Sequence, residues 1–227
     1  MPISSYPSAQ TLNQQLKVYW VFDPDQTSWP TAQLWDLVEA TLAAGVTMVQ
    51  WRAPKRSSAH QYEDLLKLKP LCQHYNIPLI INDNVALALA VDANGVHVGQ
   101  NDMHVTEART LMGKGKIIGL STHSQAEIAA IPPDTIDYIG IGPIWPTISK
   151  ADAATAIGPE GLRSMGIVNP YPAVAIGGIN LNNIDALRNC TIAGVAVISA
   201  ISRQTDPAQA VVQLRNKCDL LFNNSST

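Results

Sequence analysis

Cysteine is scarce in this sequence, and the few that occur form no recognisable pattern. Among 227 residues there are three, Cys72, Cys190 and Cys218, which are odd in number and far apart. A disulfide framework needs an even set and a CxxC metal site needs close spacing, so neither is indicated. We therefore expect three reduced thiols that serve as packing residues.

Long apolar runs and blocks of like charge are also absent. No stretch approaches the roughly 20 apolar residues needed to cross a bilayer, so no membrane association is expected. The 15 basic and 18 acidic side chains give a net charge of −3, and no basic stretch is interleaved with aromatic residues. Nucleic acid is therefore not an expected partner. Residues 1–15 lack the basic and apolar regions of a signal peptide, which predicts a cytoplasmic location.

Common catalytic motifs are missing too, and the regular feature is an alternation of strands and helices. The absence of GxGxxG, P-loop, HExxH and GxSxG patterns argues against dinucleotide binding and several hydrolase classes. Short apolar runs alternate with segments of helical period, as in βα units around a buried parallel sheet. The predicted strands are 18–22, 47–51, 78–81, 95–98, 117–120, 138–141, 173–176 and 194–197.

Helical spacing and caps support the same organisation. Apolar residues recur at three- and four-residue spacing most clearly in segments 31–44, 59–75 and 208–221. Gly45 is a C-terminal glycine for the first helix, and Asp206 precedes a proline at the start of the last.

These elements predict one α/β domain, a (β/α)₈ TIM barrel over residues 17–221. No linker or change of composition interrupts that range. We expect a flexible N-terminal segment at 1–16 and a flexible tail at 222–227.

Polar residues follow nearly every predicted strand, where the eight βα loops of such a barrel converge and where its chemistry takes place. In strand order they are Gln50 and Arg52; Asn82 and Asp83; His97 and Asp102; Ser121 and His123; Thr147, Ser149 and Lys150; Gly177 and Gly178; and Ser199. This bias predicts an active site at that end.

Two groups of residues in this set suit the binding of a phosphate and of a metal. Thr147, Ser149 and Lys150 offer donors to phosphate oxygens, although an ordinary strand and a solvated loop would read alike. Asp83 and Asp102, on adjacent strands, could hold Mg²⁺ between them, the alternatives being a helix cap and a turn residue.

A metal held by Asp83 and Asp102 beside the cations Arg52 and Lys150 would neutralise the charge of a departing pyrophosphate. Across the mouth, Gly177, Gly178 and Ser199 suggest a second phosphate site made of backbone N–H groups. His97 and His123 are either acid–base groups or hydrogen-bonded residues at the rim of the core.

Several motifs together resemble the thiamine phosphate synthase family over nearly the whole chain. They are VQWR at 49–52, IND at 81–83, GVHVGQND at 95–102, STHS at 121–124, DYIGIGPIWPTISK at 137–150, AIGGI at 175–179 and VISAI at 197–201. The resemblance implies a Mg²⁺-dependent enzyme that joins hydroxymethylpyrimidine diphosphate to thiazole phosphate and releases pyrophosphate. It leaves open whether the chain forms a homo-oligomer.

The resemblance also implies a role for each motif residue. Asp83 and Asp102 would bind Mg²⁺, and Arg52, Asn82 and Lys150 the diphosphate. The remaining substrate contacts would be Gln50 and Ser121 to the pyrimidine, Thr147 and Ser149 to the reacting groups, and Gly178, Ile198 and Ser199 to the thiazole phosphate. Of these, Arg52, Ser121 and Lys150 would act in catalysis.

One residue departs from the family pattern, and two other functions compete. The family usually has lysine where this chain has Pro54, and Lys55 follows one place later. A thiazole tautomerase of the same fold would need no magnesium and would depend most on His123. A non-catalytic sensor of phosphate ligands would have kept the barrel without turnover.

Overall fold

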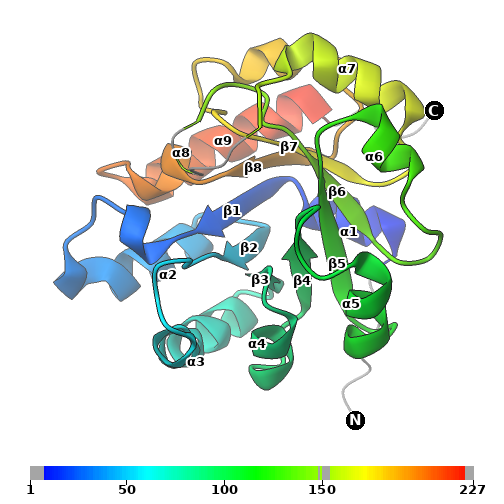
Figure 1. Ribbon diagram of the computed structural model, residues 1–227. Coiled ribbons are helices and arrows are strands. Elements are labelled where there is room, and N and C mark those ends of the chain that lie inside the picture. The colour runs from blue at the N-terminus through cyan, green and yellow to red at the C-terminus, as the bar shows by residue number, and fades with distance from the viewer. Residues whose placement is uncertain (1–7, 148, 150–153, 223–227) are drawn as a thin grey trace.

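The predicted strands close into one parallel barrel in a computed structural model that describes residues 8–147, 149 and 154–222 (Figure 1). Each strand pairs in parallel with the next, and β8 pairs with β1. The strands are β1 (Val18–Phe22), β2 (Met48–Trp51), β3 (Leu79–Asn82), β4 (Gly95–Val98), β5 (Ile117–Thr122), β6 (Tyr138–Ile141), β7 (Ala173–Ile176) and β8 (Gly194–Val197). The predicted TIM barrel is confirmed, and β1, β4, β6, β7 and β8 have the predicted bounds.

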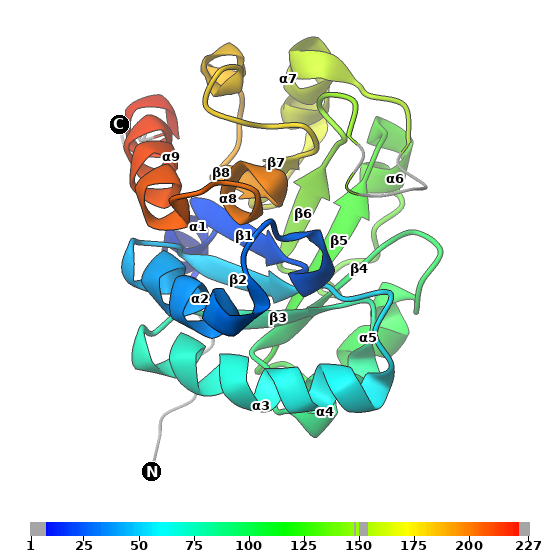
Figure 2. The same cartoon turned by 90° about the vertical axis from the view of Figure 1, so that its left-hand side faces the viewer.

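Helices surround the strands in both views of the ribbon (Figures 1 and 2). They are α1 (Ala9–Gln15), η1 (Pro24–Gln26), η2 (Thr31–Gln33), α2 (Leu34–Ala43), α3 (Ser58–His74), α4 (Val85–Ala90), α5 (Val105–Met112), α6 (Gln125–Ala129), α7 (Gly158–Val168), η3 (Ile184–Leu187), α8 (Ser199–Ser202) and α9 (Pro207–Phe222), where η marks a 3₁₀ helix. Asp206 caps α9 as expected, since its Oδ1 accepts the Gln209 N–H at 2.9 Å. No helix among the described residues is long and apolar enough to cross a membrane.

The seventh connection is the irregular one, since between β7 and β8 the chain forms only the short helix η3. Asparagine side chains bond the backbone there: Asn180 Oδ1 accepts the Asn182 N–H, and Asn183 Oδ1 accepts the Asn180 N–H, both at 2.9 Å. Such local bonds compete with those of an α-helix.

Two apolar layers hold the barrel together. One lies between the strands and the outer helices, and the other fills the barrel interior. The interior strand residues are Tyr19, Val21, Met48, Ile80, Ile117, Tyr138, Val174 and Ala196. Gly119 leaves space for one of them, because a Cβ there would lie 2.4 Å from the hydroxyl oxygen of Tyr138 and 2.4 Å from Nδ1 of His97.

The N-terminal segment, expected to be flexible over 1–16, is partly ordered. Ser8 caps α1 by accepting the Thr11 N–H at 3.2 Å, and Leu12 and Leu16 are buried against the interior layer. The expectation was wrong for residues 8–16 because these two leucines, four apart, cover the amino end of the barrel. Residues 1–7 and 223–227, also expected to be flexible, lie outside the described residues, and α9 continues through Phe222.

Candidate active site

The residues singled out from the sequence lie in or just after the carboxyl ends of the strands. Gln50, Asn82 and Ser121 are the last or near-last residues of β2, β3 and β5. The loops that follow carry Arg52, Asp83, Asp102, Thr147, Ser149, Gly178 and Ile198, and Ser199 opens the helix after β8. Lys150 lies outside the described residues. The barrel thus brings the rest of the set to one end.

Arg52 is held where three loops meet. Its Nη1 lies 3.5 Å from Oδ2 of Asp23 and 3.5 Å from the carbonyl oxygen of Ser149. Gln26 Nε2 donates to the same two residues, at 2.8 Å to Asp23 Oδ2 and 3.0 Å to Ser149 O. Asp23 is only 2% exposed, so its charge needs a nearby cation, and Arg52 provides it.

Sequence reasoning missed Asp23 and Gln26. The available signal was position, because Asp23 directly follows β1 just as the predicted residues follow their strands.

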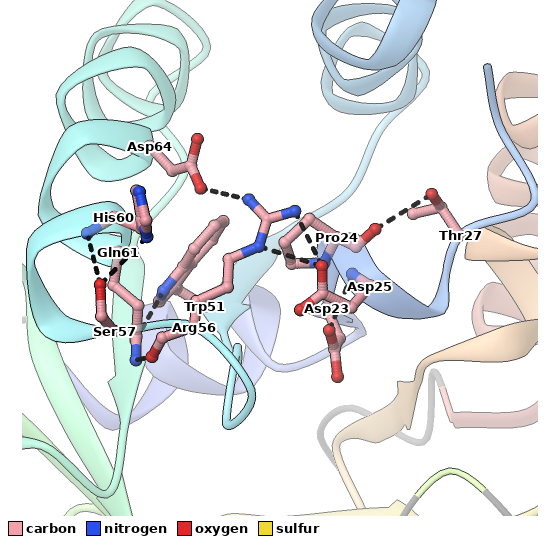
Figure 3. A network of polar contacts seen from close by, with 10 residues as sticks. All are labelled: Asp23, Pro24, Asp25, Thr27, Trp51, Arg56, Ser57, His60, Gln61 and Asp64. Carbon is pink, nitrogen blue, oxygen red and sulfur yellow. Dashed lines mark hydrogen bonds and ion pairs between the residues drawn. The ribbon is translucent and has the colours of Figure 1, made fainter. Parts of the chain in front are cut away.

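A second arginine fixes the loop after β2 (Figure 3). Arg56 donates to Asp25 Oδ1 through Nε at 3.0 Å and through Nη2 at 2.8 Å, and it also pairs with Asp64. Its carbonyl accepts from Gln61, whose side-chain oxygen accepts the Trp51 indole N–H at 3.1 Å. The loop is therefore tied to both the β1 loop and α3. Arg56 was also missed from the sequence.

Pro54 and Lys55, the departure from the family pattern, lie in this tied loop. Both are exposed, and among the described residues Lys55 makes no hydrogen bond or ion pair. Its ammonium group is thus available to an anion, whereas Arg56 is committed to two carboxylates.

Asp83 and Asp102 are exposed carboxylates on neighbouring loops, since β3 pairs with β4. Asp83 Oδ2 accepts from Asn82 Nδ2 at 2.6 Å, and Asp102 Oδ2 accepts the Gly99 N–H at 2.7 Å. The helix cap proposed as an alternative for Asp83 is wrong, because Asn84 caps α4.

The donor chemistry of these two carboxylates fits Mg²⁺. This ion is bound through one or two carboxylates, with water and substrate phosphates completing an octahedron. Within the described ranges, no three His, Cys, Asp or Glu residues gather to enclose a metal by themselves. The site therefore suits an ion that arrives with phosphate and not a closed protein cage.

Gly178 provides a close backbone approach at the far side of the mouth. Its φ is +68°, and a Cβ there would lie 2.7 Å from Cβ of Trp145 and 2.9 Å from the carbonyl of Pro146. Ser199 opens the short helix α8, directly after Ile198. First-turn N–H groups have no acceptor inside their own helix, which suits an anion.

Gln50, His97 and Ser121 belong to one hydrogen-bonded chain through the barrel interior. Gln50 Nε2 donates to the Tyr19 hydroxyl at 2.7 Å, and the hydroxyls of Tyr19 and Tyr138 lie 2.7 Å apart. His97 connects Tyr138 to Ser121, with 2.9 Å from Nδ1 to the Tyr138 hydroxyl and 2.9 Å from Nε2 to Ser121 Oγ. Burial raises the pKa of both tyrosines, so both are neutral.

His123 is half-buried and has a carboxylate partner. Its backbone N–H donates to Oε2 of Glu127 at 2.6 Å, and its Nδ1 lies 3.2 Å from the same oxygen.

The loop after β6 is shaped by a local hydrogen bond. Thr147 Oγ1 accepts the Ser149 N–H at 3.2 Å.

The cysteines take no part in this site. All three are free and buried, as expected, and burial raises the pKa of Cys72 and of Cys218 to about 12. Neither is a thiolate near neutral pH, so neither of these two thiols is a ready nucleophile. The groups at the mouth instead suit the binding of anions and the positioning of reactants.

Several known proteins resemble this chain over most of its length. A family model described as thiamine monophosphate synthase matches residues 18–201. A thiamine-phosphate synthase of Streptococcus suis is 42% identical over 201 residues, which cover 87% of this chain and 86% of that protein. One of Chloroflexus aurantiacus is 44% identical over 179 residues, covering 79% and 82%. The solved thiamine phosphate pyrophosphorylase of Pyrococcus furiosus superposes with a TM-score of 0.83 at 32% identity, covering 93% of this chain and 100% of that one.

Proposed function

Because this chain belongs to the thiamine monophosphate synthase family, we propose that it joins hydroxymethylpyrimidine diphosphate to thiazole phosphate. The products are thiamine monophosphate and pyrophosphate. The observation that carries the proposal is the match of residues 18–201, a range that includes nearly every polar group at the barrel mouth. We assign the reaction to a single domain over 17–221 and to the cytoplasm, with small molecules as substrates and a homo-oligomer as the form to be tested.

The polar residues divide between the two substrates. Arg52, Asn82 and Lys150 bind the diphosphate, and Gln50 with Ser121 contacts the pyrimidine ring. Thr147 and Ser149 face the reacting groups, while Gly178, Ile198 and Ser199 hold the thiazole phosphate. Arg52, Gln50 and Ser121 lie at or just after the carboxyl ends of β2 and β5, which supports their assignment to one substrate.

Magnesium is the proposed metal, held by Asp83 and Asp102. When bound, it neutralises charge on the diphosphate and on the departing pyrophosphate. Two exposed carboxylates on neighbouring loops support this assignment, because they leave the other positions to water and phosphate.

The protein's contribution is to stabilise a leaving group and orient two reactants. Pyrophosphate departs first, leaving a methylene cation stabilised by the electron-rich aminopyrimidine, and the thiazole nitrogen captures it. Arg52 and Lys150 place positive charge where negative charge grows. No covalent step on the protein is needed, which agrees with the raised pKa of the buried thiols.

The test is the formation of thiamine phosphate from the two purified substrates, with and without Mg²⁺. We expect turnover with the metal and at least a hundredfold loss after chelation. Proton exchange on the thiazole without condensation would instead identify a tautomerase. Tight calorimetric binding with no turnover would identify a sensor.

A further inference from the structure

The interior chain has a direction, which follows from the groups at one end. The Gln50 amide nitrogen can only donate, so the Tyr19 hydroxyl oxygen accepts from it. The Tyr19 hydroxyl therefore donates its own proton to its other partner among the described residues, the Tyr138 hydroxyl. Tyr138 in turn donates to Nδ1 of His97.

The direction continues to the mouth. A neutral His97 that accepts at Nδ1 carries its proton on Nε2, and that nitrogen donates to Ser121 Oγ. The Ser121 proton is then left to point away from the chain. At the opposite end, the Gln50 oxygen is turned away from Tyr19 and has no hydrogen-bond partner among the described residues.

Because the tyrosines are buried, the donor and acceptor directions of these hydrogen bonds can change only together. Tyr19 and Tyr138 are 1% and 0% exposed and lie among apolar side chains of the interior layer. A buried hydroxyl that loses its partner is costly, so one proton cannot turn around alone. Turning the Gln50 amide over would reverse every donor and acceptor as far as Ser121.

The sequence makes room for this arrangement. A side chain at Gly119 would occupy the place where the Tyr138 hydroxyl meets His97, with Cβ 2.4 Å from each group. Glycine at this strand position is therefore required by the contact.

We propose that this chain of hydrogen bonds makes Ser121 a donor and the Gln50 side-chain oxygen an acceptor. Together these two groups select an amino-substituted pyrimidine over its oxo counterpart. The inference rests on the proposed function and adds the basis of selectivity. An aminopyrimidine offers a ring nitrogen that accepts beside an amino group that donates. The oxo ring offers a ring N–H and a carbonyl, the inverse pattern, so both contacts would oppose like groups.

The first experiment measures selectivity. Inhibition by the oxo analogue of the pyrimidine diphosphate is compared with the KM of the amino substrate in the parent, in Tyr138→Phe and in Tyr19→Phe. We expect the parent to favour the amino ring at least about a hundredfold, which is tenfold or more for each reversed contact. Each phenylalanine variant removes one hydroxyl and so interrupts the series of hydrogen bonds. The preference for the amino ring should fall at least tenfold, while the KM for thiazole phosphate stays unchanged.

Controls separate selectivity from stability. Tyr75→Phe also removes one hydroxyl, but from the far end of α3, and should keep the parent's preference. If Tyr138→Phe does not fold, Tyr19→Phe still breaks the chain. A preference within twofold of the parent's in every folded variant would overturn the proposal.

The second experiment does not depend on the reaction. Nitrogen NMR of the free protein reports which ring nitrogen of His97 carries the proton. We expect the proton on Nε2 in the parent and a change in this signature in Tyr138→Phe. A proton on Nδ1 in the parent would reverse the chain and refute the inference, whereas lack of product in the enzyme assay would refute the proposed function.

Discussion

Asp102→Asn is the sharpest test of the metal site, because it removes a charge with little change of shape. The asparagine oxygen can still accept the 2.7 Å bond from the Gly99 N–H. Asp102 is exposed, so we expect the free energy of unfolding to change by less than about 0.5 kcal/mol. A metal supplies several kcal/mol of charge stabilisation at a reacting phosphate, and half of the protein's carboxylate charge at the site is lost. A barrier higher by about 2.7 kcal/mol gives a hundredfold lower turnover.

The assay measures turnover against Mg²⁺ concentration at saturating substrates, with a thermal melt alongside. Asp134→Asn is the matched control, since Asp134 is also exposed and its φ of +60° suits asparagine equally, but it precedes β6 at the opposite end of the barrel. We expect the control to equal the parent. Turnover of Asp102→Asn within threefold of the parent at every Mg²⁺ concentration would show that this carboxylate does not hold the metal.

Three further substitutions test the rest of the site. Gly178→Ala should lower the free energy of unfolding by about 2 kcal/mol and raise the KM for thiazole phosphate, since its φ is +68° and a Cβ would meet Trp145 and Pro146; denaturant melts and kinetics check this, and an unchanged melt would contradict it. Lys55→Ala should slow catalysis or weaken diphosphate binding at least about tenfold, roughly 1.4 kcal/mol, because its ammonium is available to an anion beside the mouth; parent-like behaviour at low salt would leave it a solvated residue. Lys150→Ala should lower the maximal rate more than it weakens binding of the diphosphate substrate, as steady-state kinetics can separate; a change in apparent affinity alone would make this lysine a uniform binding contact.

Local sequence was enough to predict the barrel and the end that carries the site. Strands buried on both faces are apolar throughout, so β1 or β8 is visible as a short run without knowledge of its neighbours. Helical spacing and the Asp206 cap are equally local. The carboxyl ends of parallel strands must meet, so residues such as Arg52 and Asp83 could be grouped before any contact was known.

Only the tertiary structure decided which side chains touch across that mouth. Tyr19 and Tyr138 are 119 positions apart, and their hydroxyls meet because the register of a closed barrel brings them together in its interior. The pairing of Asp23 with Arg52 and the packing of Leu16 against the interior layer of the barrel also depend on the tertiary structure. Periodicity records which face of a strand or helix is buried, whereas these partners depend on closure, register and loop packing. Those are properties of the whole chain, and no short segment contains them.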